Sequence, residues 1–565
     1  MDEITVNKLE KCSENEFVDC IENFNKKNSQ SFVFPDLGFS LKKRLISLLF
    51  SRLSQWPDGR ISCLEAIRIL GRDKVNLDQL FTRENLGTLV NLAGLVAEEE
   101  EIANHCTSVS DPRVIIEAQK CLCNLIYNCS LAQKTCSNNG CVEGILLRLR
   151  TYKDPNLPHE IKFFDMRMLF LLTALCAEIR PKVRDQLHGL TYLMEVLDLI
   201  LKDNVSKNSA SGTGRRTFNK GSRRGKSNQG PEVCTAPCLS DEEVDTAVEV
   251  LKVLFNLTVN TEKFNLEEEE EAHYLRLVSI LHDILLSDTK NPEKRDVLQS
   301  HTVDLLTNMP VSSYEELMTP VVKMDEDNPN IFEGMDMEAV HVLLQFLERR
   351  VEKTYKTYRE PLSPILTTLV ECSHAHSTIR KFLKKKVLPP LKDFSQRPEE
   401  GTALRNRLVK LMTSPAFDVK ELVADFLFVL CKENVTRLIK YTGYGNAAGL
   451  LAKRGLMLGG NGDGNYSSDS EDSDTEEYIK MRDKINPVVG CYQERKPNHH
   501  LDDLTEEQRE YEAMQLVDMM DKLASVSLIL FREGSIRPMR IGEDGKPIAI
   551  DHILEMREDL FKNKD

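Results

Sequence analysis

Residues 117–128 read EAQKCLCNLIYN, and residues 249–260 read EVLKVLFNLTVN. The two stretches share Glu, Lys, Leu, Asn, Leu and Asn at six of their twelve positions. Fainter copies of the same apolar pattern stand at 65–70, 167–172, 301–308, 364–369 and 422–430. The copies recur about every 50 residues or a multiple of that spacing, which is typical of armadillo and HEAT repeats with their loops.

The repeated stretches are apolar on most of their surface, so each predicts a helix buried between neighbouring repeats. Segments between them, such as 84–95 and 275–286, are amphipathic and suit outer helices. The composition agrees, because 41% of the residues are hydrophobic but only 6% are aromatic, which favours packed helices over a β-sandwich. The sequence therefore predicts an all-α armadillo/HEAT superhelix whose inner helices line a concave groove.

We expect the superhelix to occupy residues 1–455. Within it, residues 203–230 are rich in Ser, Gly, Asn and basic side chains, which predicts a disordered insert. Residues 456–503 form a Gly-rich and then acidic linker, and residues 504–530 predict a C-terminal amphipathic helix. The polar residues 531–565 are expected to be a mobile tail.

The predicted C-terminal helix has a recognisable start and one apolar face. Thr505-Glu-Glu-Gln508 has the pattern of a capping box, in which the two end side chains bond each other's backbone amides. An apolar stripe follows at i, i+3 spacing, formed by Tyr511, Met514, Val517, Met520 and Leu523. Such a face packs either on the protein itself or on a partner.

Charge and hydropathy argue against several classes of protein. The formal net charge is -15, so bulk binding of nucleic acid is not expected. The longest apolar run, 168–176, is far short of the ~18 residues that a membrane span needs, and MDEITVNKLE at the start lacks the features of a signal peptide. Fifteen cysteines without a disulfide framework are expected to be reduced thiols. These features predict a cytoplasmic protein without stable membrane insertion.

Several short motifs resemble ligand sites but do not complete them. The stretch 221–227, GSRRGKS, is one residue short of a P-loop and follows no strand, and GYGNAAG at 443–449 has the wrong spacing for dinucleotide binding. The Cys and His pairs lack the second pair that a zinc site needs. We therefore expect no metal, no cofactor and no covalent chemistry.

Cationic residues stand on otherwise apolar inner helices. They are Arg68, Arg72, Arg167, Arg380 and Lys381. Arg68 and Arg72 share one helix face because they are four residues apart. Two interpretations fit equally: the cations face a ligand carboxylate or a helix C-terminus in the groove, or they form salt bridges that hold repeats together.

An asparagine recurs at the equivalent place of three repeats, as Asn124, Asn256 and Asn308. In an armadillo protein such a side chain can hydrogen-bond the backbone of a bound peptide. The alternative is that each asparagine braces its own repeat turn. The spacing alone favours neither interpretation.

The acidic segment 466–478 reads YSSDSEDSDTEEY. Ser and Thr followed by acidic residues suit an acidophilic kinase of the casein-kinase-two type, and each phosphate would add about -1.5 to -2 charge. A phosphorylated segment could dock on a basic patch of the superhelix. The alternative is an acidic linker that only aids solubility.

Seven segments together resemble the synembryn family, also called resistance to inhibitors of cholinesterase. They are 120–125 (KCLCNL), 163–175 (FFDMRMLFLLTAL), 251–256 (LKVLFN), 380–384 (RKFLK), 387–391 (VLPPL), 405–413 (RNRLVKLMT) and 440–452 (KYTGYGNAAGLLA). The resemblance runs from about residue 30 to about residue 525. The insert 203–230 and the residues after 530 depart from the family pattern.

The resemblance implies a guanine nucleotide exchange factor and folding chaperone for G-protein α subunits. The concave face would take the C-terminal helix of Gα, GDP would leave, and the nucleotide-free Gα would be held until GTP binds. This is differential binding of two states and requires no covalent chemistry. The implied partners are Gα and an acidophilic kinase, and the implied form is a cytoplasmic monomer that is recruited to the plasma membrane.

The resemblance also assigns residues. In the groove, the positions that contact Gα would be Arg68, Arg72, Asn124, Phe164, Arg167, Asn256, His301, Arg380 and Lys381. On the C-terminal helix they would be Met514, Val517 and Met520, and the phosphorylated serines would be Ser468 and Ser473. The competing hypothesis is a passive armadillo-type adaptor that binds extended peptides and leaves nucleotide turnover on Gα unchanged.

Overall fold

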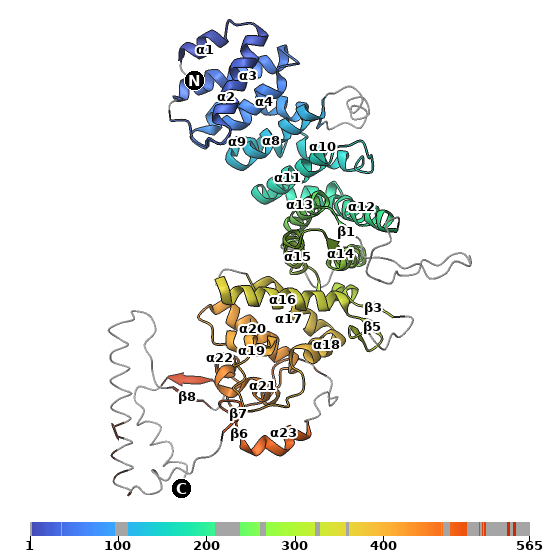
Figure 1. Cartoon of the computed structure of the whole chain (residues 1–565), viewed down its shortest axis with the longest axis vertical. Helices are drawn as coiled ribbons and strands as arrows, with labels where there is room; N and C mark the ends of the chain where they lie inside the picture. The colour runs from blue at the N-terminus through green and yellow to red at the C-terminus, as the bar shows by residue number, and fades with distance from the viewer. Residues whose placement is uncertain are drawn as a thin grey trace, which may run out of the picture. The chain divides into compact units, whose positions relative to one another are not determined.

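The computed structural model describes residues 3–35, 37–95, 111–209, 238–259, 267–321, 328–357, 361–464, 466 and 475–493, with short pieces between 505 and 549. These residues divide into two compact units, Met1–Leu317 and Met318–Asp565. The division falls inside the range 1–455 that the sequence predicts as one superhelix. Figure 1 shows both units.

The first unit contains a row of inner helices in which each helix packs on the next. The row consists of α2 (Glu14–Asn28), α4 (Arg60–Leu70), α8 (Pro112–Asn128), α11 (His159–Leu175), α13 (Asp241–Thr258) and α15 (Pro292–Leu306). The two stretches of clearest internal similarity are the bodies of α8 and α13. Their shared leucines at 122, 125, 254 and 257 are at most 1% exposed. Burying each such side chain contributes roughly 1.5–3 kcal/mol, which explains why the apolar pattern recurs.

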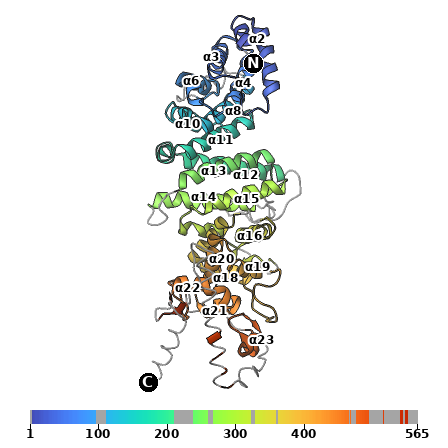
Figure 2. The ribbon, with the colours of Figure 1, turned by 90° about the vertical axis from the view of Figure 1, so that its left-hand side faces the viewer.

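A second layer covers this row. Its members pack on α4, α8, α11, α13 and α15 in turn, and they are α3 (Phe39–Gln55), α6 (Arg83–Leu92), α10 (Cys141–Leu149), α12 (Gly189–Ser209) and α14 (Glu268–Leu286). Figure 2 shows α12 and α14 beside α13 and α15. The predicted all-α helical-repeat fold is therefore confirmed. Shorter elements join the layers: α1 (Glu3–Leu9), α5 (Leu77–Leu80), α9 (Ser130–Cys136), η1 (Ala177–Ile179), η2 (Lys182–Gln186), η3 (Val311–Leu317), and the parallel pair β1 (Cys238–Leu239) and β2 (Asp288–Thr289).

The second unit is built around α20 (Phe417–Leu430), an apolar helix that contacts most of its neighbours. The helices around it are α16 (Glu338–Thr357), α17 (Ser363–Ala375), α18 (Ser377–Val387), α19 (Leu404–Leu411), α21 (Val435–Thr442) and α22 (Tyr444–Arg454). A small antiparallel sheet precedes them in the order β3 (Thr319–Pro320), β5 (Met335–Asp336), β4 (Ile331–Phe332).

Part of the stretch predicted as linker, 456–503, is folded onto the second unit. It contains α23 (Glu476–Met481), η4 (Arg482–Lys484) and the antiparallel pair β6 (Ile485–Asn486) and β7 (Cys491–Tyr492). The amides of Tyr444 and Gly445 donate to the carbonyls of Pro487 and Val488, each at 2.9 Å. A Cβ at Gly443 would lie 3.1 Å from the Val489 backbone, so glycine is needed for this close approach.

The insert and the C-terminal region differ in part from expectation. The stretch predicted as a disordered insert begins at 203, but α12 continues to Ser209, so that prediction is wrong for 203–209, and residues 210–230 lie outside the described part. The Thr505 amide donates to Gln508 Oε1 at 3.1 Å and the Gln508 amide to Thr505 Oγ1 at 3.4 Å, which confirms the capping box. In the predicted tail, β8 (Met539–Ile541) pairs antiparallel with β9 (Pro547–Ala549).

The state of the cysteines and the hydropathy of the helices can also be compared with the sequence analysis. Every described cysteine is a free thiol. None of the helices in the described part of the chain is long and apolar enough to cross a membrane.

Candidate functional site

Two equivalent charge clusters occupy the inner helices of the first unit. In α8, Glu117 accepts a hydrogen bond from Arg68 Nε of α4, and Lys120 Nζ lies 3.5 Å from its other oxygen. In α13, Glu249 Oε1 accepts from Arg167 Nη1 of α11 at 3.0 Å and from Lys252 Nζ at 2.8 Å.

The internal repeat explains this equivalence. Each cluster combines a Glu and a Lys, three residues apart on one helix, with an Arg from the preceding inner helix. Burial fixes the geometry, because Glu117 is 8% and Glu249 4% exposed. The clusters thus have the inter-repeat salt bridges that one interpretation of the sequence predicts.

The two clusters differ in net charge. Arg68 also pairs with Glu65 at 3.2 Å, so the first cluster balances two cations with two carboxylates. In the second cluster the only carboxylate paired with Arg167 and Lys252, among the described residues, is Glu249. The Arg167 side chain is 39% exposed, so a second anion can reach this cluster from solvent.

Aromatic rings lie beside these cations. The Lys120 ammonium is 5.6 Å from the centroid of Phe164, while Arg167 and Lys252 lie 5.6 and 5.4 Å from the centroid of Phe170. Such contacts add roughly 0.5–1 kcal/mol where they are exposed. The surface therefore combines cationic and aromatic groups, which suits an amphipathic helix with a negative end.

The three recurring asparagines, Asn124, Asn256 and Asn308 (the asparagine ladder), connect neighbouring repeats. Asn124 Nδ2 donates to the Arg68 carbonyl at 3.3 Å, and Asn256 Nδ2 donates to Thr173 Oγ1 at 3.1 Å. Asn308 Nδ2 donates to the carbonyl of Phe255 and to Thr258 Oγ1, both at 3.1 Å. Each asparagine side chain donates to the preceding inner helix. The interpretation that each asparagine braces its own repeat turn is therefore wrong, because the bond joins two neighbouring repeats.

Arg72 lies two residues beyond the end of α4 at Leu70, so the prediction that it shares a helix face with Arg68 is wrong, and His301 lies in α15, the last helix of the row. Arg72 Nη1 donates to the Ser29 carbonyl at 2.6 Å, and its guanidinium lies 5.5 Å from the centroid of Phe32, which is 65% exposed. Burial, followed by the nearby Arg68 cation, lowers the pKa of Arg72. In α15, His301 Nδ1 is 3.4 Å from Asp304 Oδ2 of the same helix.

The remaining predicted groove residues, Arg380 and Lys381, belong to α18 of the second unit. Lys381 Nζ donates to Glu333 Oε1 at 3.1 Å. Arg380 is only 4% exposed, and its guanidinium lies 4.9 Å from the centroid of Tyr466. A partner could touch the guanidinium face under this ring only after Tyr466 had moved.

A glycine-rich strap, formed by residues 459–464 and Tyr466, is bound by Glu433 and His374. The amides of Gly462 and Gly464 donate to the carbonyl and the Oε2 atom of Glu433, at 2.8 and 3.0 Å. Glu433 is 3% exposed and has the left-handed φ of 49°. Its other oxygen lies 3.7 Å from Nε2 of His374, and His374 Nδ1 is 3.3 Å from the Tyr466 hydroxyl. These contacts were not predicted, because Gly-rich sequence by itself is typical of a flexible linker.

Several predicted sites fall outside the described residues: Ser468, Ser473, Val517 and Met520. Of the predicted apolar stripe, Tyr511 and Met514 are described and are 66% and 59% exposed. Beyond the acidic stretch, the Thr475 hydroxyl donates to the Leu391 carbonyl at 2.8 Å.

The described residues form no group of three or more metal-ligating side chains. Burial raises the pKa of the Cys63 thiol to about 12 and that of Cys129 to about 11, so both are poor nucleophiles at neutral pH. Fold and surface together define a helical-repeat protein of the armadillo/HEAT type that presents repeated cationic and aromatic groups.

Comparison with known proteins narrows this class to one family. The family described as "Guanine nucleotide exchange factor synembryn" matches residues 63–546. The chain is 41% identical over 549 residues to "Chaperone Ric-8A" of Gallus gallus, covering 96% of this chain and 95% of the relative. It is 42% identical over 552 residues to "Chaperone Ric-8A" of Xenopus tropicalis, covering 97% and 96%. The chain belongs to the synembryn family, as the sequence motifs predicted.

Among solved structures, a crystal structure of an engineered protein is similar with a TM-score of 0.40 and 15% identity, covering 83% of this chain and 96% of that chain. This distant likeness carries no weight for function.

Proposed function

We propose that this protein is a guanine nucleotide exchange factor and folding chaperone for G-protein α subunits. It binds GDP-bound or nascent Gα through the C-terminal helix of Gα, promotes release of GDP, and stabilises the nucleotide-free state until GTP binds. The observation that carries this proposal is the family match over residues 63–546.

The charge clusters supply a physical reason for recognition of the Gα tail. A helix C-terminus carries about half a negative charge from its unpaired carbonyls, and the chain end adds a carboxylate. Arg167 and Lys252 share one carboxylate and so retain a net positive charge for such a ligand. The rings of Phe164 and Phe170 beside the cations suit apolar side chains of the same helix.

Exchange then follows from differential affinity. A protein that binds the opened, empty Gα more tightly than the GDP-bound form shifts the equilibrium toward the empty form without forming or breaking a covalent bond. The same preference stabilises a partly folded Gα during chaperoning. We assign a second contact with Gα to the C-terminal helix, through Met514, Val517 and Met520; the 59% exposure of Met514 supports this assignment.

Phosphorylation of Ser468 and Ser473 by a casein-kinase-two-type kinase strengthens this activity in our proposal. Two described residues of the acidic segment make contacts within the second unit: the Tyr466 ring lies 4.9 Å from the Arg380 guanidinium, and the Thr475 hydroxyl donates to the Leu391 carbonyl. The helix α18 presents lysines at 381, 384, 385 and 386 in the same unit. The protein acts as a cytoplasmic monomer that is recruited to the plasma membrane.

The test is GDP release from a purified inhibitory-type Gα, with and without this protein. Gα lacking its last dozen residues serves as the matched substrate. We expect acceleration that is lost on truncation of the tail. No acceleration by either the unphosphorylated or the phosphorylated protein would refute exchange activity, and unchanged nucleotide turnover despite peptide binding would favour the passive adaptor.

A further inference from the structure

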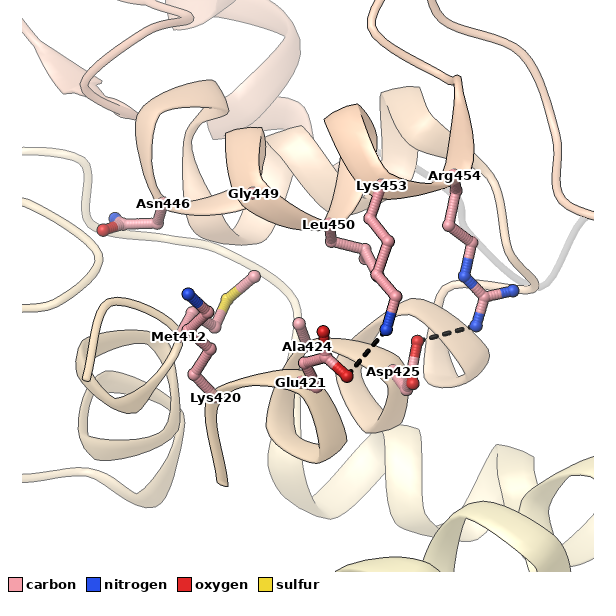
Figure 3. Close-up of a pocket in the computed structure, with 10 residues that line it drawn as sticks. All are labelled: Met412, Lys420, Glu421, Ala424, Asp425, Asn446, Gly449, Leu450, Lys453 and Arg454. Carbon is pink, nitrogen blue, oxygen red and sulfur yellow. Dashed lines mark hydrogen bonds and ion pairs between the residues drawn. The ribbon is translucent and has the colours of Figure 1, made fainter. Parts of the chain in front are cut away.

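A cavity of about 230 Å³ lies between α20 and α22 in the second unit (Figure 3). Its apolar lining comes from Met412, Ala424 and Leu450, which are 5%, 5% and 9% exposed. Gly449 of α22 completes this lining, and no atom beyond its chain neighbours and its own helix backbone lies within 4 Å of the place where a Cβ would stand. The cavity can therefore accept an apolar side chain, and a larger residue at 449 would fill it.

Charged groups border the same cavity. Lys453 Nζ is 2.7 Å from Glu421, and Arg454 Nη2 is 2.6 Å from Asp425, as Figure 3 shows. These two pairs leave Lys420 as the third cation of the lining. In the described part of the chain no carboxylate pairs with Lys420. The border thus carries three cations and two carboxylates, and both carboxylates are already engaged.

An exposed aromatic ring extends the site. Phe417 is 58% exposed, and the ammonium groups of Lys420 and Lys453 lie 5.3 and 5.8 Å from its centroid. An exposed aromatic beside an apolar cavity is unusual on a surface without a partner, since aromatic anchors are enriched where proteins meet. The excess of one cation selects for an acidic partner.

We infer that this cavity docks an acidic segment of Gα that lies outside the Gα C-terminal helix, with an apolar side chain inserted against Gly449 and a carboxylate beside Lys420. This inference rests on the proposed function and adds a further contact surface to the groove and the C-terminal helix. The tail and the acidic segment would then bind to different surfaces, the tail to the first unit and the acidic segment to α20 and α22.

The test is the affinity of the full-length protein for purified inhibitory-type Gα and for Gα lacking its last dozen residues. Gly449→Leu fills the cavity and also raises helix propensity, so the variant is expected to fold. We expect it to weaken binding of both forms of Gα by about tenfold, a change typical of losing one anchor side chain. Lys420→Glu should weaken binding less and mainly slow association, and its effect should shrink as salt is raised.

Matched controls exist in the chain. Gly87 in α6 is a helical glycine with the same open surroundings, and Lys484 is an exposed lysine of the second unit. Gly87→Leu and Lys484→Glu should leave both affinities unchanged. Wild-type affinity in Gly449→Leu, with full-length Gα binding normally, would overturn this inference and leave the proposed function standing.

Two other outcomes are informative. Failure of the wild-type protein to bind full-length Gα would overturn the proposed function and this inference with it. If Gly449→Leu and a variant with the acids at 469, 471, 472 and 474 neutralised both bound Gα more tightly, the cavity would hold the chain's own acidic segment, and the inference would be overturned.

Discussion

The guanidinium of Arg167 in α11 donates to the buried carboxylate of Glu249 in α13 at 3.0 Å, although 82 residues separate the two in sequence. The same arrangement joins Arg68 of α4 and Glu117 of α8, two inner helices earlier in the row. These two pairs link consecutive inner helices and also place cations on the surface proposed to bind Gα. Stability and recognition therefore depend on the same side chains.

Glu249→Ala should destabilise the first unit, because it leaves Arg167 and Lys252 without their shared carboxylate. Arg167 is partly exposed, so water screens part of the loss, and we expect a decrease of about 1–3 kcal/mol in the free energy of unfolding. Hydrogen exchange across α11 and α13 would measure it. Glu476→Ala removes an exposed i, i+4 pair and should change nothing measurable, and equal exchange in both variants would contradict the prediction.

Asn256→Ala should also lower stability, because Thr173 Oγ1 and the Phe170 carbonyl lose a shared donor between repeats. The expected loss is about 1–2 kcal/mol, measured as faster hydrogen exchange around residues 170–173. Asn138 is exposed and follows α9, and its side chain donates to the Lys134 carbonyl of that adjacent helix, so Asn138→Ala supplies the control. Weaker Gα binding at unchanged stability would instead show that Asn256 acts on the ligand.

Arg72→Ala should weaken Gα binding about fivefold to tenfold while leaving the fold intact. Its bond to the Ser29 carbonyl and its contact with exposed Phe32 are peripheral, so we expect a stability loss of only about 0.5–1.5 kcal/mol. Titration calorimetry and thermal unfolding on the same sample separate the two effects. A large fall in the melting temperature with unchanged affinity would assign Arg72 a purely structural role.

Gly462→Ala should release the strap, because a Cβ at this position would overlap the carboxylate of buried Glu433. We expect faster proteolysis within residues 459–466 and exposure of Arg380 as Tyr466 leaves it. Gly449→Ala adds the same methyl group where there is open space, so its cleavage pattern should match the wild type. Identical cleavage of all three proteins would show that Glu433 does not hold the strap.

Acidification should lower the stability of the second unit. Burial lowers the pKa of His374 below its ordinary value of 6.5. The unfolded state therefore binds a proton more readily, and stability of the second unit falls as pH drops through about 6.5. Thermal unfolding between pH 7.5 and 5.5 would record this loss, and His374→Gln should reduce it. An unchanged pH dependence in His374→Gln would assign the effect to other groups.

The sequence predicted the class of fold and the family, because both depend on local pattern. The helices α8 and α13 bury the leucines that make their repeat visible, and this apolar pattern is kept although the segments between the repeats differ in length. Family motifs such as 440–452 are contiguous in the sequence, so they can be recognised without a structure. The predicted groove contacts and phosphorylation sites remain predictions.

What sequence could not determine is the partner of each polar side chain. Arg380 and Tyr466 lie 86 positions apart, and nothing local indicates that the ring covers the guanidinium. Likewise, the direction of the asparagine ladder depends on how far one repeat is rotated on the next. Local apolar periodicity therefore determined the helices and their stacking, whereas long-range packing decided which charges are satisfied, which are buried, and where a cavity such as that at Gly449 stays open.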